Sequence, residues 1–281
     1  MTAPLSPLLV EEAVRRALEE DLGLAGDITT SACIPENATS RAVIAARRAG
    51  VIAGVDLAQA AFRLVDPAIR TSVDHGDGAP VHVADIVMHI EGPSRGILSA
   101  ERVALNFLGH LSGVATATAA LVEAVKGTKA KIACTRKTTP GLRAFEKHAV
   151  LCGGGANHRF GLFDAVMIKD NHIAAAGGIA AALCAARDSV GHMVKIEIEV
   201  DSLAQLEEAL KDGADVILLD NMSVTELKEA VALAKGRAVL EASGGVSLDT
   251  VRAIAETGVD RISSGWITHS APALDLGLDF L

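Results

Sequence analysis

Polar and glycine residues follow a series of short apolar runs in the second half of the chain. Six runs end in residues of this kind, namely Thr135-Arg136-Lys137, Lys169-Asp170-Asn171-His172, Glu199-Val200-Asp201, Asp220-Asn221, Ser243-Gly244-Gly245 and Ser263-Ser264-Gly265. The alternative is that these polar residues simply begin loops. That alternative accounts for one or two of the six ends, but it accounts poorly for basic or acidic residues at four of them. These positions are therefore the first candidates for a functional site.

Basic residues are concentrated in the segment 136–172, whereas the chain around it is net acidic. The candidates for one cleft are Arg136, Lys137, His158, Arg159 and Lys169. Arginine grips a carboxylate or phosphate with two parallel hydrogen bonds, and lysine acts as a point charge. A solvated basic face is the alternative. The position of the cations beside apolar runs and the glycine-rich stretch 153–155 favours an anion site.

Two acids, Glu199 and Asp220, end consecutive apolar runs. If the runs are neighbouring parallel strands, which lie about 4.8 Å apart, both carboxylates reach one Mg²⁺ ion or the hydroxyls of one sugar. Helix-capping acids are the alternative, and that interpretation fits Asp201 better than Glu199. Glu199 and Asp220 are therefore candidate catalytic acids that could share a Mg²⁺ ion or bind sugar hydroxyls.

Glycine turns follow the last two apolar runs. Glycine lets backbone N–H groups approach a phosphate closely. The predicted phosphate site comprises Ser243, Gly244, Gly245, Ser264 and Gly265. His269 is a candidate to close this pocket, although a single histidine is more often structural. A phosphate, a pyrophosphate and a carboxylated partner together indicate substitution at a sugar carbon, with acids near the ring and cations near the leaving group.

The elements that carry these residues alternate between strand and helix after residue 128. The predicted strands are 131–134, 165–168, 194–200, 216–219, 238–240 and 261–262, and the predicted helices are 141–151, 177–189, 202–211, 223–235 and 247–257. Such alternation predicts parallel strands with right-handed crossovers. Active sites of (β/α) barrels lie at the carboxyl ends of the strands. Six or seven strands are fewer than eight, so we expect an open, incomplete (β/α) barrel in the α/β class.

The first half of the chain has a mixed pattern. Helical spacing covers 8–20, strand-like pieces include 41–45 and 86–90, and a helix is expected near 56–65. Ser99-Ala100-Glu101 is typical of a helix start, because serine caps free backbone N–H groups. We expect Gly109 to Gly113 to bend or interrupt the helix that follows.

Composition excludes several classes of protein. The net charge is −9, and six Phe, one Trp and no Tyr leave little surface for stacking bases, so no nucleic-acid partner is expected. The four cysteines have no C-x-x-C spacing, which argues against a zinc or redox site. The first residues do not resemble a signal peptide, and the apolar stretch 173–186 is too short to span a bilayer. We expect a soluble, cytoplasmic protein.

Several strings in a fixed order resemble the quinolinate phosphoribosyltransferase family over nearly the whole chain. The matching strings are 99–108 (SAERVALNFL), 110–116 (HLSGVAT), 135–141 (TRKTTPG), 153–159 (GGGANHR), 168–172 (IKDNH), 218–222 (LLDNM) and 241–245 (EASGG). The resemblance implies a reaction of quinolinate with phosphoribosyl pyrophosphate that yields nicotinate mononucleotide, pyrophosphate and CO2. It also implies an N-terminal α/β sandwich domain (1–115), the barrel domain (116–270) and a tail (271–281) that packs back on the first domain.

Residue by residue, the resemblance implies that Arg136, His158, Arg159 and Lys169 hold the quinolinate carboxylates, while Lys137 lies between quinolinate and the phosphates. It further implies a homodimer or a multiple of dimers in which Arg102 reaches the site from the partner subunit. A surface ion pair of Arg102 with Glu101 or Glu123 is the alternative. Two other functions stay open: a paralogue of the same fold associated with molybdenum transport, and a non-catalytic anion-binding protein.

Overall fold

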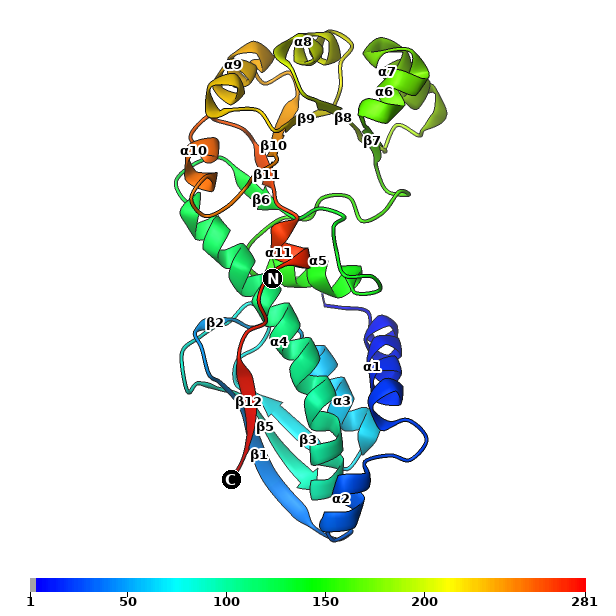
Figure 1. Cartoon of the computed structure of the whole chain (residues 1–281), viewed down its shortest axis with the longest axis vertical. Coiled ribbons are helices and arrows are strands. Elements are labelled where there is room, and N and C mark those ends of the chain that lie inside the picture. Colours follow the sequence, from blue (N-terminus) through cyan, green and yellow to red (C-terminus); the bar gives the residue numbers. More distant parts are fainter. Residues whose placement is uncertain (1–3) are drawn as a thin grey trace. The chain divides into compact units, whose positions relative to one another are not determined.

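The computed structural model describes residues 4–281, which form two compact units (Figure 1). The first unit combines the chain up to Ala119 with Ala144–Gly154 and Ser270–Leu281. The second unit combines Ala120–Arg143 with Gly155–His269. The segment 144–154, in the middle of the expected barrel, thus belongs to the first unit.

The first unit contains a four-stranded antiparallel sheet with the strand order β12-β1-β5-β3. Its elements are α1 (Pro7–Leu22), α2 (Ile28–Cys33), β1 (Thr39–Ala46), β2 (Gly50–Val51), α3 (Val55–Val65), β3 (Arg70–Val73), β4 (Pro80–Val81), β5 (Ile86–Pro93), most of α4 (Ser94–Ala124), α5 (Arg143–Cys152) and β12 (Leu276–Phe280). Ile44 of β1, Phe62 of α3 and Leu108 of α4 are fully buried. Sheet and helices therefore share one apolar core.

Helix α4 differs from the sequence prediction at two places. It begins at Ser94 rather than Ser99, and it runs through Gly109 and Gly113 without a break. A Cβ atom at Gly113 would overlap the backbone of Pro272, and one at Gly109 would lie 3.1 Å from the carbonyl oxygen of Leu274. These glycines are therefore present because another segment packs directly against the helix, and the predicted interruption was wrong.

Helix α4 is also long and apolar enough to cross a membrane by length and composition alone. Its most apolar window has a mean hydropathy of 1.3, and 56% of that window is buried inside the fold. Core helices of soluble proteins pass the same test, so this feature is weak support for a membrane span.

The second unit is built on a six-stranded parallel sheet with the order β6-β11-β10-β9-β8-β7. Its elements are β6 (Lys131–Ala133), β7 (Val166–Ile168), α6 (Asp170–Ala176), α7 (Ile179–Ser189), β8 (Ile196–Val200), α8 (Leu203–Lys211), β9 (Val216–Asp220), α9 (Val224–Ala234), β10 (Val239–Ser243), α10 (Val251–Ala255), β11 (Arg261–Ser263) and α11 (Trp266–His269). β6 and β7 are the two ends of the order and do not pair with each other. The predicted open, incomplete barrel is confirmed.

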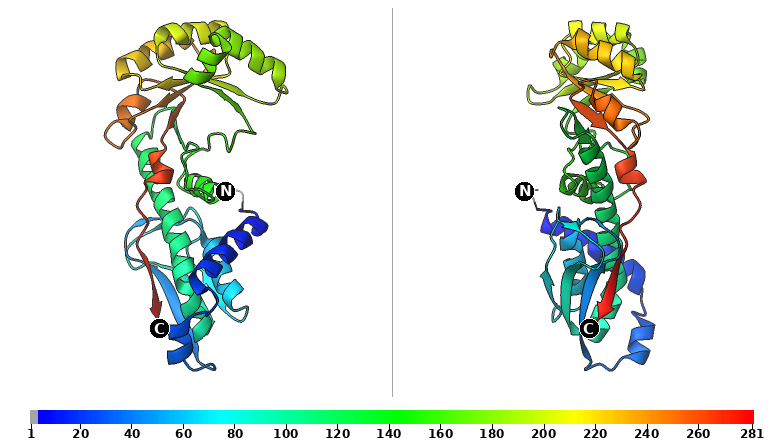
Figure 2. Two further views of the ribbon diagram at one scale, coloured as in Figure 1. Left: turned by 45° about the vertical axis from the view of Figure 1, so that its right-hand side comes forward. Right: turned by 90° about the vertical axis from the view of Figure 1, so that its left-hand side faces the viewer.

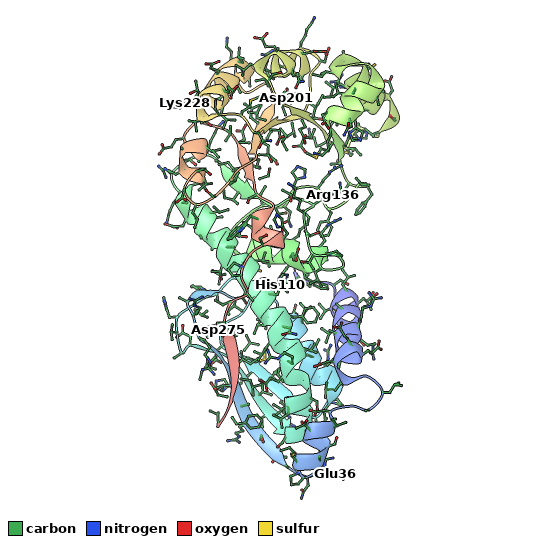
Figure 3. All side chains as sticks on the ribbon, in the orientation of Figure 1. Glu36, His110, Arg136, Asp201, Lys228 and Asp275 are labelled. Atoms are coloured by element: carbon green, nitrogen blue, oxygen red, sulfur yellow. The ribbon has the colours of Figure 1, made fainter. Side chains whose placement is uncertain are left out.

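In the second unit, the helices lie along the outer face of the sheet, and the inner face of the sheet is on the opposite side (Figures 1 and 2). Successive side chains of a strand point to opposite faces. In β8 the apolar Ile196, Ile198 and Val200 alternate with Glu197 and Glu199, and helices α7 and α8 pack on this strand. Exposed side chains such as Lys228 on α9 line the solvent side of the outer layer (Figure 3). The alternation therefore directs the two glutamates away from the outer helices.

The predicted strands and helices of this unit are present, with shifted ends. Helix α6 was not predicted, and Gly177 and Gly178, at φ of 88° and 132°, separate it from α7. Helix α10 is shorter than the predicted 247–257, because Ser247 and Thr250 bond to each other in a turn before it. Turn chemistry thus replaces the first helical turn there.

Candidate active site

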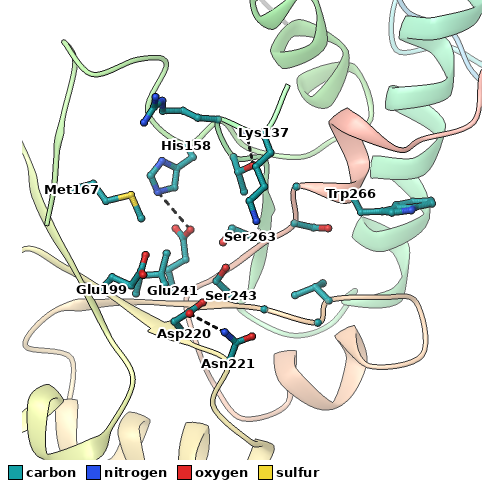
Figure 4. Close-up of a pocket in the computed structure, with 18 of the residues that line it drawn as sticks. Lys137, His158, Met167, Glu199, Asp220, Asn221, Glu241, Ser243, Ser263 and Trp266 are labelled. Carbon is teal, nitrogen blue, oxygen red and sulfur yellow. Dashed lines mark hydrogen bonds and ion pairs between the residues drawn. The ribbon is translucent and has the colours of Figure 1, made fainter. Parts of the chain in front are cut away.

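A cavity of about 760 Å³ lies at the carboxyl ends of the barrel strands, within the second unit (Figure 4). Thirteen of the fourteen residues proposed from the sequence line it: Arg136, Lys137, His158, Arg159, Lys169, Glu199, Asp220, Ser243, Gly244, Gly245, Ser264, Gly265 and His269. Cavity residues that the sequence analysis did not select include Met167, Glu241 and Trp266. Parallel strand ends explain this convergence, because each contributes its first loop residues to one edge.

Two arginines supply unpaired donors to the cavity. In the part of the chain that the structure describes, the Nε atoms of Arg136 and Arg159 are buried without a hydrogen-bond partner. Burial, and then the charge of Arg136, lowers the pKa of the Arg159 guanidinium below its usual range. Buried charged donors without partners are costly, so this geometry is suited to an anionic ligand that completes them.

Arg143 supports this basic wall and was not selected from the sequence. Its guanidinium donates to the backbone oxygens of Arg136 and Phe160, at 3.3 and 3.1 Å. It thereby ties the loop after β6 to the loop before β7. Only its place within the basic segment 136–172 marked it in the sequence.

Lys169 and Glu199 form an ion pair at the end of the barrel. Lys169 Nζ lies 2.5 Å from Glu199 Oε2, and the lysine side chain keeps 44% of its exposure. The pair joins β7 to β8, which are neighbours in the sheet. The ammonium group is therefore held in place while one side stays open to the cavity.

Glu199 and Asp220 end neighbouring strands but are not directly opposite each other. Glu199 is in register with Leu218, and Asp220 is in register with Ser243 of β10. Asn221 Nδ2 donates to Asp220 Oδ2 at 2.8 Å, and this bond fixes the carboxylate. The two acids are thus offset by two residues along neighbouring strands, and Figure 4 shows both at the pocket.

The loop after β10 has the backbone that a phosphate site requires. Gly244 and Gly245 both adopt positive φ, 96° and 59°. A Cβ atom at Gly244 would overlap the side chain of Asn221, so only glycine fits there. Glycines at such angles leave backbone N–H groups accessible to an anion.

His158 is engaged by the protein itself at both ring nitrogens. Its Nδ1 accepts the backbone N–H of Arg159 at 2.7 Å, and its Nε2 lies 2.8 Å from Glu197 Oε2 and 3.6 Å from Glu241 Oε1. Both glutamates are buried, with 6% and 4% exposure. His158 therefore lies between the anion-binding wall and two carboxyl groups inside the strands.

These two glutamates were missed because the sequence analysis considered only strand ends. A usable signal is present, since Glu197 lies two residues before Glu199 and Glu241 lies two residues before Ser243. The period of two places each on the same face as its neighbour at the strand end. An acid in the middle of an apolar strand is the pattern to look for.

Arg102 lies on α4 in the first unit and is exposed. Among the described residues 4–281 it has no ion pair within its own chain, with Glu101, with Glu123 or with any other acid. The surface ion pair considered from the sequence is therefore absent from this structure.

Both halves of the chain match domain models of a known protein family. Residues 27–112 match the N-terminal domain model of quinolinate phosphoribosyl transferase, and residues 114–279 match the C-terminal domain model. Together these matches span nearly all of the described chain.

Individual relatives agree with the family models. The chain is 41% identical to a probable nicotinate-nucleotide pyrophosphorylase [carboxylating] of Bacillus subtilis, with 98% of this chain and 94% of that protein covered. It is 45% identical to the nicotinate-nucleotide pyrophosphorylase [carboxylating] of Mycobacterium leprae, covering 95% and 96%. The crystal structure of NadC from Streptococcus pyogenes superposes with a TM-score of 0.95 at 42% identity, over 100% of both chains.

Proposed function

Because the chain belongs to the quinolinate phosphoribosyltransferase family, we propose that the cavity at the strand ends is where quinolinate meets phosphoribosyl pyrophosphate. The protein is a decarboxylating pentosyltransferase of NAD biosynthesis. Its reaction forms nicotinate mononucleotide and releases pyrophosphate and CO2. The observation that supports this location most directly is the pair of buried guanidinium Nε atoms, which lack partners among the described residues.

Quinolinate carries two adjacent carboxylates, and the basic wall offers matching cations. Arg136, Arg159 and Lys169 take these carboxylates in our proposal, and Lys137 lies between the pyridine and the phosphates. His158 orients this wall through its neighbour, because its ring accepts the backbone N–H of Arg159. A dicarboxylate neutralises more of the buried positive charge than a monocarboxylate does.

The ribose and the metal belong with the acids in this proposal. Glu199 is already neutralised by Lys169, whereas the hydrogen bond to Asp220 within the described residues comes from the neutral Asn221. Asp220 therefore fits Mg²⁺, which proteins bind with one or two carboxylates plus substrate phosphates. Glu199 faces the ribose, where a carboxylate stabilises positive charge developing on the ring. The metal, when bound, neutralises negative charge on the departing pyrophosphate.

The glycine loops complete the substrate site. Ser243, Gly244 and Gly245 follow β10, Ser264 and Gly265 follow β11, and His269 of α11 lines the same cavity. We assign the phosphates to these residues. Both strands are adjacent in the sheet, so their loops form one surface.

The chemistry requires no general base. Pyridine nitrogen is nucleophilic at neutral pH and attacks the sugar carbon as pyrophosphate leaves. The attack makes the ring cationic, and the cationic ring accepts the electron pair released when the adjacent carboxylate departs as CO2. The protein therefore contributes positioning and electrostatic stabilisation.

Substrate choice tests the proposed cavity. We expect turnover with quinolinate and at least a hundredfold lower kcat/KM with nicotinate, because the missing carboxylate leaves buried cations unpaired. Incubation of the protein with Mg²⁺, phosphoribosyl pyrophosphate and each acid, followed by chromatography of the nucleotide products, gives the measurement. Comparable turnover of nicotinate would contradict the assignment of the basic wall.

A dimer with a shared site is the second part of the proposal. Arg102 is exposed and lacks an ion pair within the described chain, and it lies in one of the strings that resemble the family. We propose that it supplies a cation to the barrel of a partner subunit. A two-fold dimer uses the same patch twice, so each barrel receives one arginine.

Mixed dimers provide a direct test of this arrangement. Arg102→Ala and Lys169→Ala should each be nearly inactive. A dimer of one chain of each kind contains one intact barrel facing one intact Arg102, so random mixing should restore roughly a quarter of wild-type activity. Co-expression with two different tags allows the mixed dimers to be isolated. If verified mixed dimers stay inactive, Arg102 does not act across an interface.

The remaining expectations concern compartment and partners. We propose a cytoplasmic enzyme without a nucleic-acid or membrane partner. The described residues form no disulfide among Cys33, Cys134, Cys152 and Cys184, which fits a reducing compartment. The net charge of −9 opposes binding to nucleic acid.

A further inference from the structure

Two acids lie beneath the substrate cavity, inside strands rather than at their ends. Glu197 of β8 and Glu241 of β10 are both buried, and Glu241 lines the cavity. Figure 4 shows the Glu241 carboxyl group pointing toward His158 from the floor of the pocket. None of the roles assigned above uses Glu241.

The tautomer of His158 follows from its partners. Nδ1 accepts the backbone N–H of Arg159, so the ring hydrogen is on Nε2 and is donated to Glu197 at 2.8 Å. A second hydrogen on Nδ1 would point at the Arg159 N–H, so the ring reaches the two carboxyl groups through Nε2 alone. It therefore offers one ring hydrogen to two carboxyl groups.

The surroundings of Glu241 favour its protonated form. Burial, and then the charge of Glu197, raises the pKa of Glu241 to about 7, while His158, Ser263 and Arg261 act in the opposite direction. Among the described residues, Glu241 Oε1 has no hydrogen-bond partner. A carboxyl group with this environment holds a transferable proton at neutral pH.

The reaction needs such a proton. When the bond between the ring carbon and its carboxylate breaks, the electron pair stays on the ring carbon as CO2 leaves. That carbon must then gain a proton before nicotinate mononucleotide is complete. Arginine does not titrate in this range, and Lys169 is already paired with Glu199.

We propose that Glu241 donates the proton that replaces the departing carboxylate. The O–H bond of Glu241 breaks, the C–H bond of the product ring forms, and Glu241 becomes a carboxylate. Water reprotonates it after the product leaves. This inference rests on the proposed location of quinolinate in the cavity, and it adds a proton donor to that site.

The test is Glu241→Gln, because glutamine has nearly the same shape as protonated glutamate and is also uncharged. A purely structural role for a neutral side chain is kept by this change, whereas proton donation is lost. We expect kcat for nicotinate mononucleotide to fall about 10²–10⁴-fold, the range that general acids contribute, while KM for quinolinate changes less than about threefold. Quenched reactions analysed by mass spectrometry should show the ribosylated dicarboxylate accumulating.

A second variant protects the test against loss of folding. Glu241→Asp keeps an acid on a shorter side chain, so it should keep more turnover than Glu241→Gln and a kcat that falls as the acid deprotonates at higher pH. Turnover of Glu241→Gln within about threefold of wild type, or a Glu241→Asp variant no better than a folded Glu241→Gln, would overturn the proposal. Failure of the proposed function itself looks different, since the wild-type protein would then form no product from quinolinate.

Discussion

A histidine lies beside acidic side chains in each of the two units, and the charges of the two clusters are balanced differently. In the first unit, His148 Nε2 lies 2.7 Å from Asp77 Oδ2, and Cys152 follows one turn along α5. The other oxygen of Asp77 accepts the backbone N–H of Val55 at 3.0 Å. Hydrogen bonds that His148 donates to Asp77 and then to Cys152 raise the pKa of His148 to about 10. The result is one cation that matches one carboxylate.

The cluster in the second unit contains more acid than cation. His158 offers one ring hydrogen and bonds to Glu197, and Glu241 Oε1 has no hydrogen-bond partner among the described residues. Both clusters bring potential metal ligands within 4.8 Å of one another. Of these two clusters, the second lines the cavity at the strand ends. A buried cluster in which positive and negative charges match stabilises a fold. A cluster with excess carboxyl groups beside a cavity instead provides a group that can react there.

The largest effect should come from the cavity side of this comparison. Lys169→Ala should lower kcat/KM for quinolinate about 10²–10³-fold, because it removes one preorganised charge. The melting temperature should change little, since Lys169 keeps 44% of its exposure. Steady-state kinetics and calorimetry measure the two quantities. Lys228→Ala, which removes an exposed lysine of α9, is the matched control and should change neither. A Lys169→Ala variant with normal turnover would mean that the site is elsewhere.

In the first unit we expect a substitution to lower stability and to leave turnover nearly unchanged. Asp77→Asn should lower the free energy of unfolding by about 3 kcal/mol, because it leaves the buried His148 without its counter-charge. The kcat of the folded variant should stay within about twofold of wild type. Denaturant unfolding followed by circular dichroism gives the stability. Asp74→Asn is the control: it breaks the half-exposed pair with His89, which is worth less than about 1 kcal/mol.

The stability difference between wild type and Asp77→Asn should depend on pH, because the pKa of His148 is raised. His148 binds its proton more tightly in the folded state, so its contribution is complete below its unfolded pKa of 6.5 and is lost as pH rises through about 10. The stability gap between wild type and Asp77→Asn should therefore narrow between pH 7 and pH 10. A gap that widens over this range would show that His148 is not held as a cation.

The smallest expected effect concerns Glu241 of the second cluster and the free energy of unfolding. The pKa of Glu241 is raised to about 7 from 4.5, so ionisation of Glu241 destabilises the folded state increasingly as pH rises through that interval. Glu241→Gln removes this cost and should raise the free energy of unfolding at pH 8 by about 1–3 kcal/mol, with little change at pH 4.5. Thermal unfolding at both pH values measures it. Lower stability than wild type at pH 8 would contradict a strained acid at this position.

The sequence predicted the barrel and its polar mouth because both follow from local patterns. Apolar runs gave the strands, and residues such as Arg136, Lys169 and Asp220 were visible where each run ends. Glu241 was not selected, because its role depends on burial and on Glu197 of a strand two places away in the sheet. Proximity across a sheet is set by topology, which local patterns do not contain.

Helix α4 is a second case in which local sequence patterns do not contain the deciding contact. Gly109 and Gly113 carry an ordinary helix-breaking signal, yet the helix continues because Pro272 and Leu274 pack against them. Propensity is a weak prior that tertiary contacts override. The segment responsible is far away in the sequence, so no window around the glycines reveals it.

The pairing of β1 with β12 has a consequence for how the protein is made. Ala46 pairs with Leu276 and Ala42 with Phe280, so one side of β1 has no strand beside it until the ribosome has translated the whole barrel. During that interval the nascent chain presents an open strand edge, which is prone to pair with other chains. Contacts between such distant segments also form slowly. We therefore expect β1 to be the segment of the first unit that most needs protection from other chains before residues 276–280 are made.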